Sequence, residues 1–363
     1  MIDVQKLADE LEPIIRQAMA RAQIPSVTVA LVSGDRIIWT WAAGESNIWA
    51  RTPADPRAVY LIGSTFKTMS ALALLTLMEG GKFSLDDPVR EYLDFELHGD
   101  DPGNPVTFRH LLTHTSGIVG DLGSVPVWSS SAPLPLDQFV RTLLEVKVPP
   151  MTKVEYSDAA FALVGYLIQR LSSVEFTQYI QHRIFRPLEM SSTVFEPSPE
   201  VEERMAIPYV VDRDTRRHIP VQRVKLAAFP AGVVYGTVLD QANFLIASLN
   251  NGVFRGNRIV SEALMDQMFE LQFEQFAGGI EGLWGNETAG FGLAWWLQKR
   301  DGENYFAHSG SLPGYTAFLL GNRDRKLGFA VLTNGNEAHA ELFQLGDLTI
   351  DLMKKYSFAD GSV

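Results

Sequence analysis

The first fifty residues show two different spacings of apolar positions. Over the first twenty-odd residues the apolar side chains recur every three or four positions, which predicts an amphipathic helix. Two strand-like runs follow, "SVTVALVS" (26–33) and "RIIWTWAAG" (36–44), separated by Gly34-Asp35, a pair typical of a hairpin turn. The chain is therefore expected to open as helix, strand, strand.

The middle of the chain is expected to be mainly helical. The run "KTMSALALLTLMEGGK" (67–82) is apolar almost all round, which predicts a helix buried on most sides. Further helices are predicted for "DQFVRTLLEV" (137–146), with Asp137 as its N-cap, and for "AAFALVGYLIQRLS" (159–172). The irregular segment "GSVPVWSSSAPLPL" (123–136) is long enough to suggest the rim of a functional site.

From about residue 291 the pattern changes to strands, and the chain closes with a helix. The predicted strands are "FGLAWWLQKR" (291–300), "NYFAHSG" (304–310), "YTAFLLGNRD" (315–324) and "KLGFAVLTNG" (326–335), followed by a helix over 340–356. We expect an α/β protein of the α+β type, with an antiparallel sheet flanked by helices. One lobe would combine residues 1–83 and 231–363, and residues 84–230 would form a second, mostly helical lobe.

Composition excludes several functional classes. The 363 residues carry a net charge of −12 without any run of Lys or Arg, which argues against nucleic acid and anionic membranes as partners. Because there is no cysteine, disulfides, thiol catalysis and thiolate metal sites are excluded. The N-terminal segment mixes charged with apolar residues, unlike a signal peptide, so a cytoplasmic location is expected.

The stretch "IGSTFKT" (62–68) carries a candidate nucleophile. Ser64 and Lys67 are three residues apart at the start of a helix, so they share a face one turn apart. A serine hydroxyl needs an adjacent base. Burial and the helix dipole both lower a lysine pKa, which favours the neutral, basic form. A helix N-terminus also offers backbone N–H groups to an oxyanion.

Two further motifs accompany this pair. "VEYSDAAF" places Tyr156 just before a strong helix and two residues from Asp158, and "YFAHSGSLPGY" places His308 at the end of a strand-like run. Ser-x-x-Lys, Tyr-Ser-Asp and His-x-Gly each occur once, in that order.

With these three motifs, the sequence resembles the serine β-lactamase and penicillin-binding-protein superfamily. It is most similar to the class C-type branch, which includes β-lactamase-like esterases, D-aminopeptidases and D-amino-acid amidases. The likeness extends through "LMEGGKFSLDDPVREYL", "TFRHLLTHTSGI", "FPAGVVYGTVLDQANFL" and "FAVLTNG".

The resemblance implies a β-lactamase/transpeptidase-like fold, an active site in the cleft between the lobes, and a role for each motif residue. Ser64 would attack an ester or amide carbonyl, and Lys67 and Tyr156 would share the proton transfer, with either as the base. The backbone N–H groups of Ser64 and Ser311 would hold the oxyanion. His308 and Gly310 would line the substrate site, with His308 hydrogen-bonding the substrate or Tyr156.

Two residues depart from the family pattern. His308 replaces the lysine that helps true β-lactamases to grip the β-lactam carboxylate, which favours the esterase and peptidase branches. Asp158 replaces an asparagine that donates to the substrate, whereas an ionised aspartate only accepts. Two roles stay open for Asp158: it pairs with Lys67 and raises the lysine pKa, or it receives an ammonium group of the substrate.

Three other features have less specific interpretations. His110 and His114 have a spacing that binds zinc on a helix, but without a third ligand no metal site is expected. Trp295 and Trp296 fall in a predicted strand, so one ring should face the core and the other outward. "GGIEGLWGNETAG" (278–290) is interpreted as a loop near the mouth of the site.

We therefore expect a cofactor-free serine hydrolase that cleaves an ester or amide of a small molecule through a Ser64 acyl-enzyme. A carboxylesterase is the leading interpretation. A D-amino-acid amidase or aminopeptidase, or an acyltransferase, is the alternative, and the oligomeric state is left open. The hypothesis of another class is a catalytically silent binding or scaffold protein. The catalytic hypothesis requires Ser64 Oγ to lie within hydrogen-bond reach of both Lys67 and Tyr156.

Overall fold

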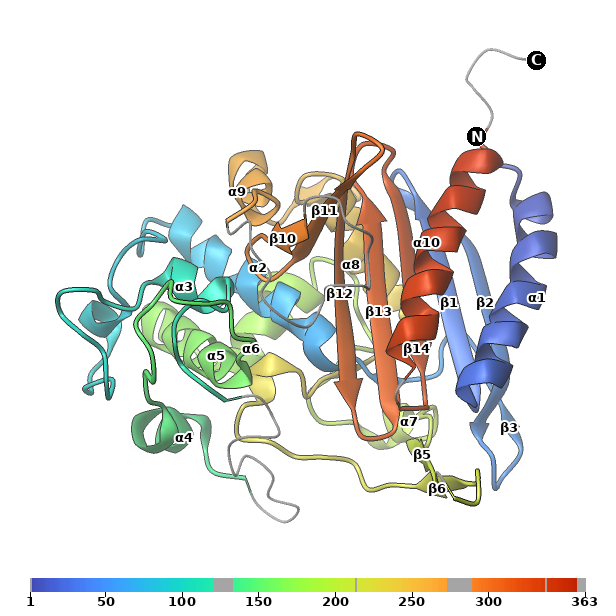
Figure 1. Ribbon diagram of the computed structural model, residues 1–363, viewed down its shortest axis with the longest axis horizontal. Coiled ribbons are helices and arrows are strands. Elements are labelled where there is room, and N and C mark those ends of the chain that lie inside the picture. The colour runs from blue at the N-terminus through green and yellow to red at the C-terminus, as the bar shows by residue number, and fades with distance from the viewer. Residues whose placement is uncertain (1, 121–132, 213, 273–288, 337, 358–363) are drawn as a thin grey trace.

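A computed structural model describes residues 2–120, 133–212, 214–272, 289–336 and 338–357. Its main feature is an eight-stranded antiparallel sheet in the order β10-β11-β12-β13-β14-β1-β2-β3. Strand β1 lies between β14 and β2, so segments from both ends of the chain form one sheet (Figure 1). The strands are β1 (Ser26–Ser33), β2 (Arg36–Asn47), β3 (Thr52–Pro53), β10 (Ala289–Phe291), β11 (Trp296–Arg300), β12 (Glu303–Leu312), β13 (Tyr315–Asn322) and β14 (Leu327–Thr333).

Helices cover both faces of this sheet, which is why every residue of β13 and β14 is buried. Helices α1 (Val4–Ala22) and α10 (His339–Lys355) lie side by side over one face, where they pack on Phe318 and Phe329 (Figure 1). Helix α8 (Val238–Leu249) covers the opposite face. The sheet is thus the middle layer of three, as the apolar patterns of its strands predict.

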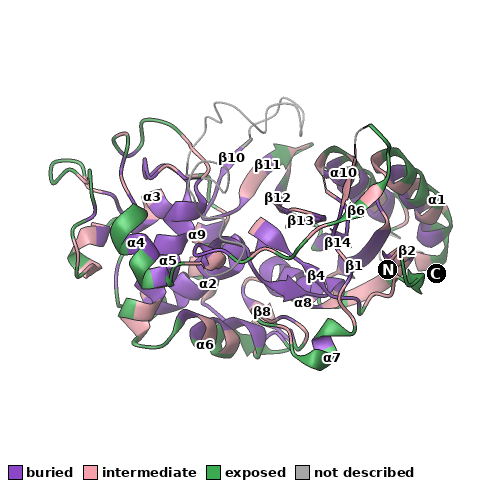
Figure 2. Cartoon of the chain, turned by 90° about the horizontal axis from the view of Figure 1, so that it is seen from below, coloured by how far each residue is buried: buried purple, intermediate pink, exposed green. Residues whose placement is uncertain are grey.

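The remaining helices gather beside this layered part. Helix α2 (Phe66–Glu79) is buried from Phe66 to Leu77 and packs against α5 (Asp158–Ser172). Both helices are mostly buried, as their purple colour in Figure 2 shows. The other helical elements are short: η1 (Gly63–Thr65), η2 (Val89–Tyr92), α3 (Phe108–Leu112), α4 (Leu136–Leu143), α6 (Phe176–Ile180), a π turn η3 (Gln181–Phe185), α7 (Pro199–Glu202), η4 (Phe229–Ala231) and α9 (Glu262–Met268). The remaining strands form two-stranded antiparallel pairs: β4 (Tyr60–Leu61) with β7 (Tyr235–Gly236), β5 (Tyr209–Val211) with β6 (His218–Pro220), and β8 (Val253–Phe254) with β9 (Asn257–Arg258).

The predicted opening helix, hairpin and closing helix are confirmed, and Gly34 turns the hairpin with φ 63°. Two local predictions are wrong. Asp137 does not cap its helix, because α4 already begins at Leu136 after Pro135 and has no side-chain cap. The run 291–300 is not one strand: it ends at Phe291 and resumes at Trp296, with Ala294 at φ 63° between them.

The break also changes the outcome for the two tryptophans. Trp295 lies outside any strand and is fully buried, whereas Trp296 is half-buried on β11. The lobe boundaries at residues 83 and 230 stay a prediction. Most of the segment 123–136 and of 278–290 lies outside the described residues.

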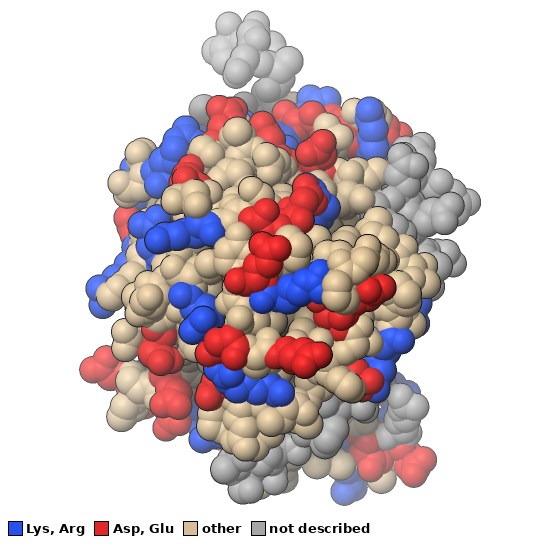
Figure 3. All heavy atoms as spheres, turned by 90° about the vertical axis from the view of Figure 1, so that its left-hand side faces the viewer, with Lys and Arg blue, Asp and Glu red and all other residues tan. Residues whose placement is uncertain are grey.

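None of the helices in the described ranges is long and apolar enough to cross a membrane. Figure 3 shows acidic and basic side chains interspersed over the face that forms the left-hand side of Figure 1.

Candidate active site

The turn that carries Ser64 is built from closely packed backbone. Gly63 has φ 57°, a left-handed conformation that favours glycine, and it leads into η1 and then α2. Thr65 Oγ1 donates to the Ile62 carbonyl at 2.8 Å, which ties the turn to the residue before it. Ser64 is half-buried at this junction, and Lys67 lies one helical turn further on.

Lys67 is fully buried, and its ammonium nitrogen has three acceptors. Nζ donates to Ser64 Oγ at 2.9 Å, to the Ala231 carbonyl at 2.8 Å, and to Asp158 Oδ1. A lysine ammonium has three N–H donors and no acceptor. All three donors are therefore used, and one of them points at the candidate nucleophile.

Asp158 is the first residue of α5, which begins after Ser157 as N-cap. A carboxylate is favoured there by the positive end of the helix dipole. Its side chain is only 5% exposed and forms an ion pair with Lys67. This contact corresponds to the first of the two roles left open by the sequence; the second, binding of a substrate ammonium, stays a prediction.

The ion pair changes the expected chemistry of Lys67. Burial pulls the pKa of Lys67 down, but attraction to the Asp158 carboxylate and to Tyr156, with the hydrogen bond to Asp158, outweighs it, so the pKa is raised. Of the two directions that the sequence left open, the raised pKa that follows from pairing with Asp158 is confirmed, because the carboxylate of α5 stabilises the buried charge.

Tyr156 lies beside this pair. Its ring centre is 4.8 Å from Lys67 Nζ, and the side chain is half-buried. Burial raises the pKa of the Tyr156 phenol, while the charge of Lys67 opposes that rise. Ser64, Lys67 and Tyr156 are thus brought together from the η1–α2 junction and the start of α5.

His114 belongs to the same site, which the sequence analysis did not predict. Its ring stacks on Tyr156 with centroids 4.3 Å apart, and its Nδ1 accepts from the Ser157 N–H at 3.0 Å. Because Nδ1 accepts, the ring proton is on Nε2, which is buried and has no partner among the residues that the structure describes. Burial, with the charge of Lys67, holds the pKa of His114 well below its ordinary value. The sequence singled out His114 only for its spacing from His110, and its place in "TFRHLLTHTSGI" is the one further signal.

His110 and His114 do not share a helix. Helix α3 ends at Leu112, and His114 has φ 58°, so the spacing is not helical. His110 Nδ1 accepts from the Thr107 N–H within a capping box. Within the described residues, no group of three or more His, Asp or Glu side chains is placed to hold a metal.

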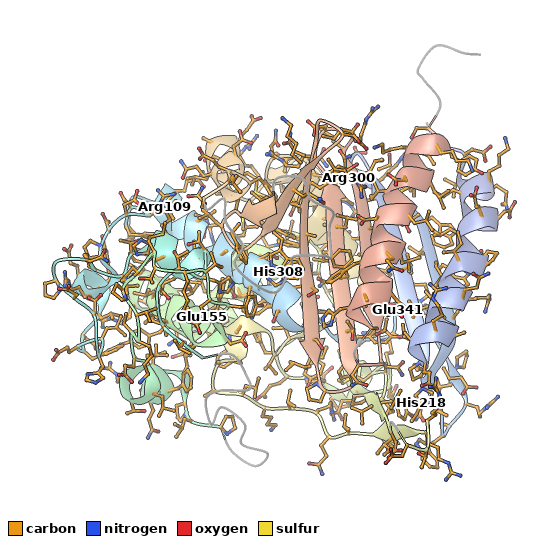
Figure 4. The ribbon with its side chains drawn as sticks, viewed as in Figure 1. Arg109, Glu155, His218, Arg300, His308 and Glu341 are labelled. Carbon is orange, nitrogen blue, oxygen red and sulfur yellow. The ribbon has the colours of Figure 1, made fainter. Side chains whose placement is uncertain are left out.

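His308 lies on β12, on the side that faces α2, as Figure 4 shows. The ring is fully buried and stacks on Trp296 at 4.9 Å. Its Nδ1 lies 2.5 Å from the Ser309 carbonyl and therefore donates, which leaves Nε2 as an acceptor that no described part of the chain contacts by a hydrogen bond. Burial and the nearby Lys67 charge lower the pKa of His308 to about 3, so the ring is neutral where a lysine would be charged.

The turn that carries Ser64 and the segment that ends in Ser311 approach closely because both contain glycine. A Cβ on Gly63 would lie 2.7 Å from the Ser311 nitrogen. A Cβ on Gly310 would lie 2.9 Å from the Ser64 nitrogen and 2.1 Å from the Ile62 carbonyl oxygen. The end of β12 therefore packs directly on the turn that carries Ser64. The oxyanion role of the two amides stays a prediction.

Comparisons with known proteins identify relatives over most of the chain. The family model described as Beta-lactamase matches residues 11–352. Penicillin-binding protein 4 of Amycolatopsis lactamdurans is 28% identical over 337 residues, which are 90% of this chain and 86% of that protein. Protein flp of Staphylococcus aureus strain MW2 is 23% identical over 333 residues. That match covers 91% of this chain but only 64% of flp, so the chain spans less than two thirds of that relative.

Solved structures give the same fold. The octameric penicillin-binding protein homologue from Pyrococcus abyssi superposes with a TM-score of 0.79 at 27% identity, covering 98% of this chain and 79% of that one. The D-amino acid amidase from Ochrobactrum anthropi SV3 superposes with a TM-score of 0.77 at 22% identity, covering 96% and 99%. The fold class predicted from the sequence, an antiparallel sheet with helices in a β-lactamase/transpeptidase-like arrangement, is confirmed.

Proposed function

The chain belongs to the Beta-lactamase family, and we propose that it is a serine hydrolase that cleaves small-molecule esters through an acyl-enzyme at Ser64. The observation that carries the proposal is the 2.9 Å contact between Lys67 Nζ and Ser64 Oγ, with the Tyr156 ring 4.8 Å from the same nitrogen. A nucleophile with two proton-transfer groups in reach is what acyl transfer requires.

The reaction follows from this arrangement. Ser64 Oγ attacks the substrate carbonyl and loses its proton to the Lys67–Tyr156 pair. The Ser64 and Ser311 amides donate to the oxyanion, whose charge they stabilise without reorganising. The leaving group departs with a proton, and water then releases the acyl group from Ser64.

A carboxylesterase is the best-supported member of this class. His308 is neutral, so this position offers no positive charge to a substrate carboxylate. Its free Nε2 accepts hydrogen bonds, which favours an uncharged ester or a substrate with a donor group. The amidase alternative is supported by Asp158 only if that carboxylate leaves Lys67 to bind an ammonium.

Intact-protein mass spectrometry tests the proposal directly. The protein is exposed to a fluorophosphonate, p-nitrophenyl acetate, a D-amino-acid amide and a penicillin, beside Ser64→Ala. We expect a stable fluorophosphonate adduct and turnover of the ester, both lost in Ser64→Ala.

The matched control is Ser70→Ala on the same helix, because Ser70 is buried and donates to the Pro230 carbonyl. This variant should keep the adduct. Absence of any adduct in the unaltered protein would overturn the proposal and favour a silent binding protein. Preferred turnover of the amide would replace the esterase by the amidase.

A further inference from the structure

Lys67 cannot act as a base in the state that the structure describes. Because the ion pair with Asp158 raises its pKa, Lys67 is an ammonium, and its three donors go to Ser64 Oγ, the Ala231 carbonyl and Asp158 Oδ1, so the nitrogen has no lone pair for the Ser64 proton. Ser64 Oγ accepts from Lys67 instead of donating to it. A proton must leave Lys67 before the serine can be activated through it.

Only one of the three acceptors can take that proton. The Ser64 oxygen is the nucleophile itself, and the Ala231 carbonyl is a peptide group. Asp158 is a carboxylate, already in close contact with Nζ and 5% exposed. An asparagine at this position would offer an amide, which does not accept a proton.

We propose that Asp158 is a positioning residue that stores a proton of Lys67 while Lys67 takes the proton of Ser64. The inference rests on the proposed acyl-enzyme function. It extends that function to the Tyr-Ser-Asp motif (156–158), where this chain has an aspartate.

The step balances without any further reactant. As the bond between Ser64 Oγ and the acyl carbon forms, the Ser64 O–H bond breaks and its proton moves to Lys67 Nζ. In the same step Nζ passes one of its protons to Asp158 Oδ1, so Lys67 remains an ammonium and Asp158 becomes a neutral acid. When the carbon–leaving group bond breaks, the leaving group takes a proton from Lys67, which recovers its own from Asp158.

The surroundings of Lys67 favour a proton that stays within the pair. Four titratable groups face Lys67. Asp158 is the first residue of α5, and Tyr156 lies just before the N-cap of that helix. The other two are His114, which follows α3, and His308 on β12. Both histidines are buried and neutral, and Tyr156 is a phenol at neutral pH. These three neighbours therefore keep their protonation over the neutral range, and we expect the acylation rate to be flat there.

The test is the pH dependence of the acylation rate of p-nitrophenyl acetate in the full chain and in Asp158→Asn. Without the carboxylate, Lys67 must lose a proton to solvent before it can act. In Asp158→Asn we expect the pH below which the acylation rate falls to be higher by about one unit or more. Below that pH the rate should drop about tenfold for each pH unit. The control is Asp240→Asn, a buried carboxylate bonded to Ser192 and Thr193, whose profile should match the unaltered protein.

A second measurement needs no variant, which matters if Asp158→Asn does not fold. Two protons move in the proposed step, so the acylation rate should depend on the deuterium fraction of the solvent as a quadratic function. A linear dependence, or an Asp158→Asn profile identical to that of the unaltered protein, overturns the inference while acylation of Ser64 persists. Failure of Ser64 to be acylated at all would instead overturn the proposed function.

Discussion

Lys67 and Asp158 form an ion pair in which the lysine side chain is fully buried and the aspartate side chain is 5% exposed. Removing one partner of such a pair leaves an uncompensated buried charge, whereas removing both costs little. We expect Lys67→Met to lower the free energy of unfolding by about 3–5 kcal/mol. The double variant Lys67→Met with Asp158→Asn should recover most of that loss, measured by urea unfolding.

The surface pair Lys6 and Asp3 is the control for this cycle, because the lysine side chain is 65% exposed. Lys6→Met should change the free energy of unfolding by less than about 1 kcal/mol. A Lys67→Met protein as stable as the unaltered one would show that the charge is not effectively desolvated.

The sequence predicted the elements and the motif residues better than it predicted their interactions. Periodicity found the helix and hairpin at the start of the chain and the buried helix that carries Lys67, because each depends on local spacing. The sign of the Lys67 pKa shift depends on Asp158, which is far away in sequence. His114 was missed for the same reason, since its contact with Tyr156 is purely tertiary.

The buried neutral His308 should make stability depend on pH. Its pKa is about 3 in the folded protein against an ordinary 6.5, so the unfolded chain binds the proton more readily between these values. The free energy of unfolding contributed by His308 is therefore fully present above about pH 6.5 and is lost as the pH falls, by up to about 1.4 kcal/mol per unit. Between pH 7 and 4, the free energy of unfolding measured in urea should fall less steeply with falling pH in His308→Gln than in the unaltered protein.

His98 supplies the control for this titration, because its side chain is 81% exposed. The slope should change less in His98→Gln than in His308→Gln. If His308→Gln keeps the full slope, other groups are responsible for the loss of stability in acid.

His114 should hold Tyr156 in place for catalysis. In His114→Ala the Ser157 N–H loses its acceptor and Tyr156 loses its stacking partner, a change worth about 1–3 kcal/mol. We expect kcat for ester hydrolysis to fall about 10- to 100-fold with little change in KM. His114→Asn should recover part of kcat, because asparagine tolerates the φ of 58° and offers an acceptor. Equal losses in both variants would contradict this role.

Gly310 should be essential for the geometry around Ser64. An alanine Cβ there would lie 2.1 Å from the Ile62 carbonyl oxygen and 2.9 Å from the Ser64 nitrogen, so the turn or the end of β12 must move. Since loss of a single oxyanion donor costs about 100- to 1,000-fold, we expect Gly310→Ala to slow acylation by at least about 100-fold.

Gly103→Ala is the control, because its Cβ would come no closer than 3.4 Å, to the side chain of Asp101. Time-resolved mass spectrometry of the fluorophosphonate adduct measures both variants. Normal acylation in Gly310→Ala would show that the reaction does not depend on the close packing of the end of β12 on the Ser64 turn. That result would contradict an oxyanion site formed by the amides of Ser64 and Ser311.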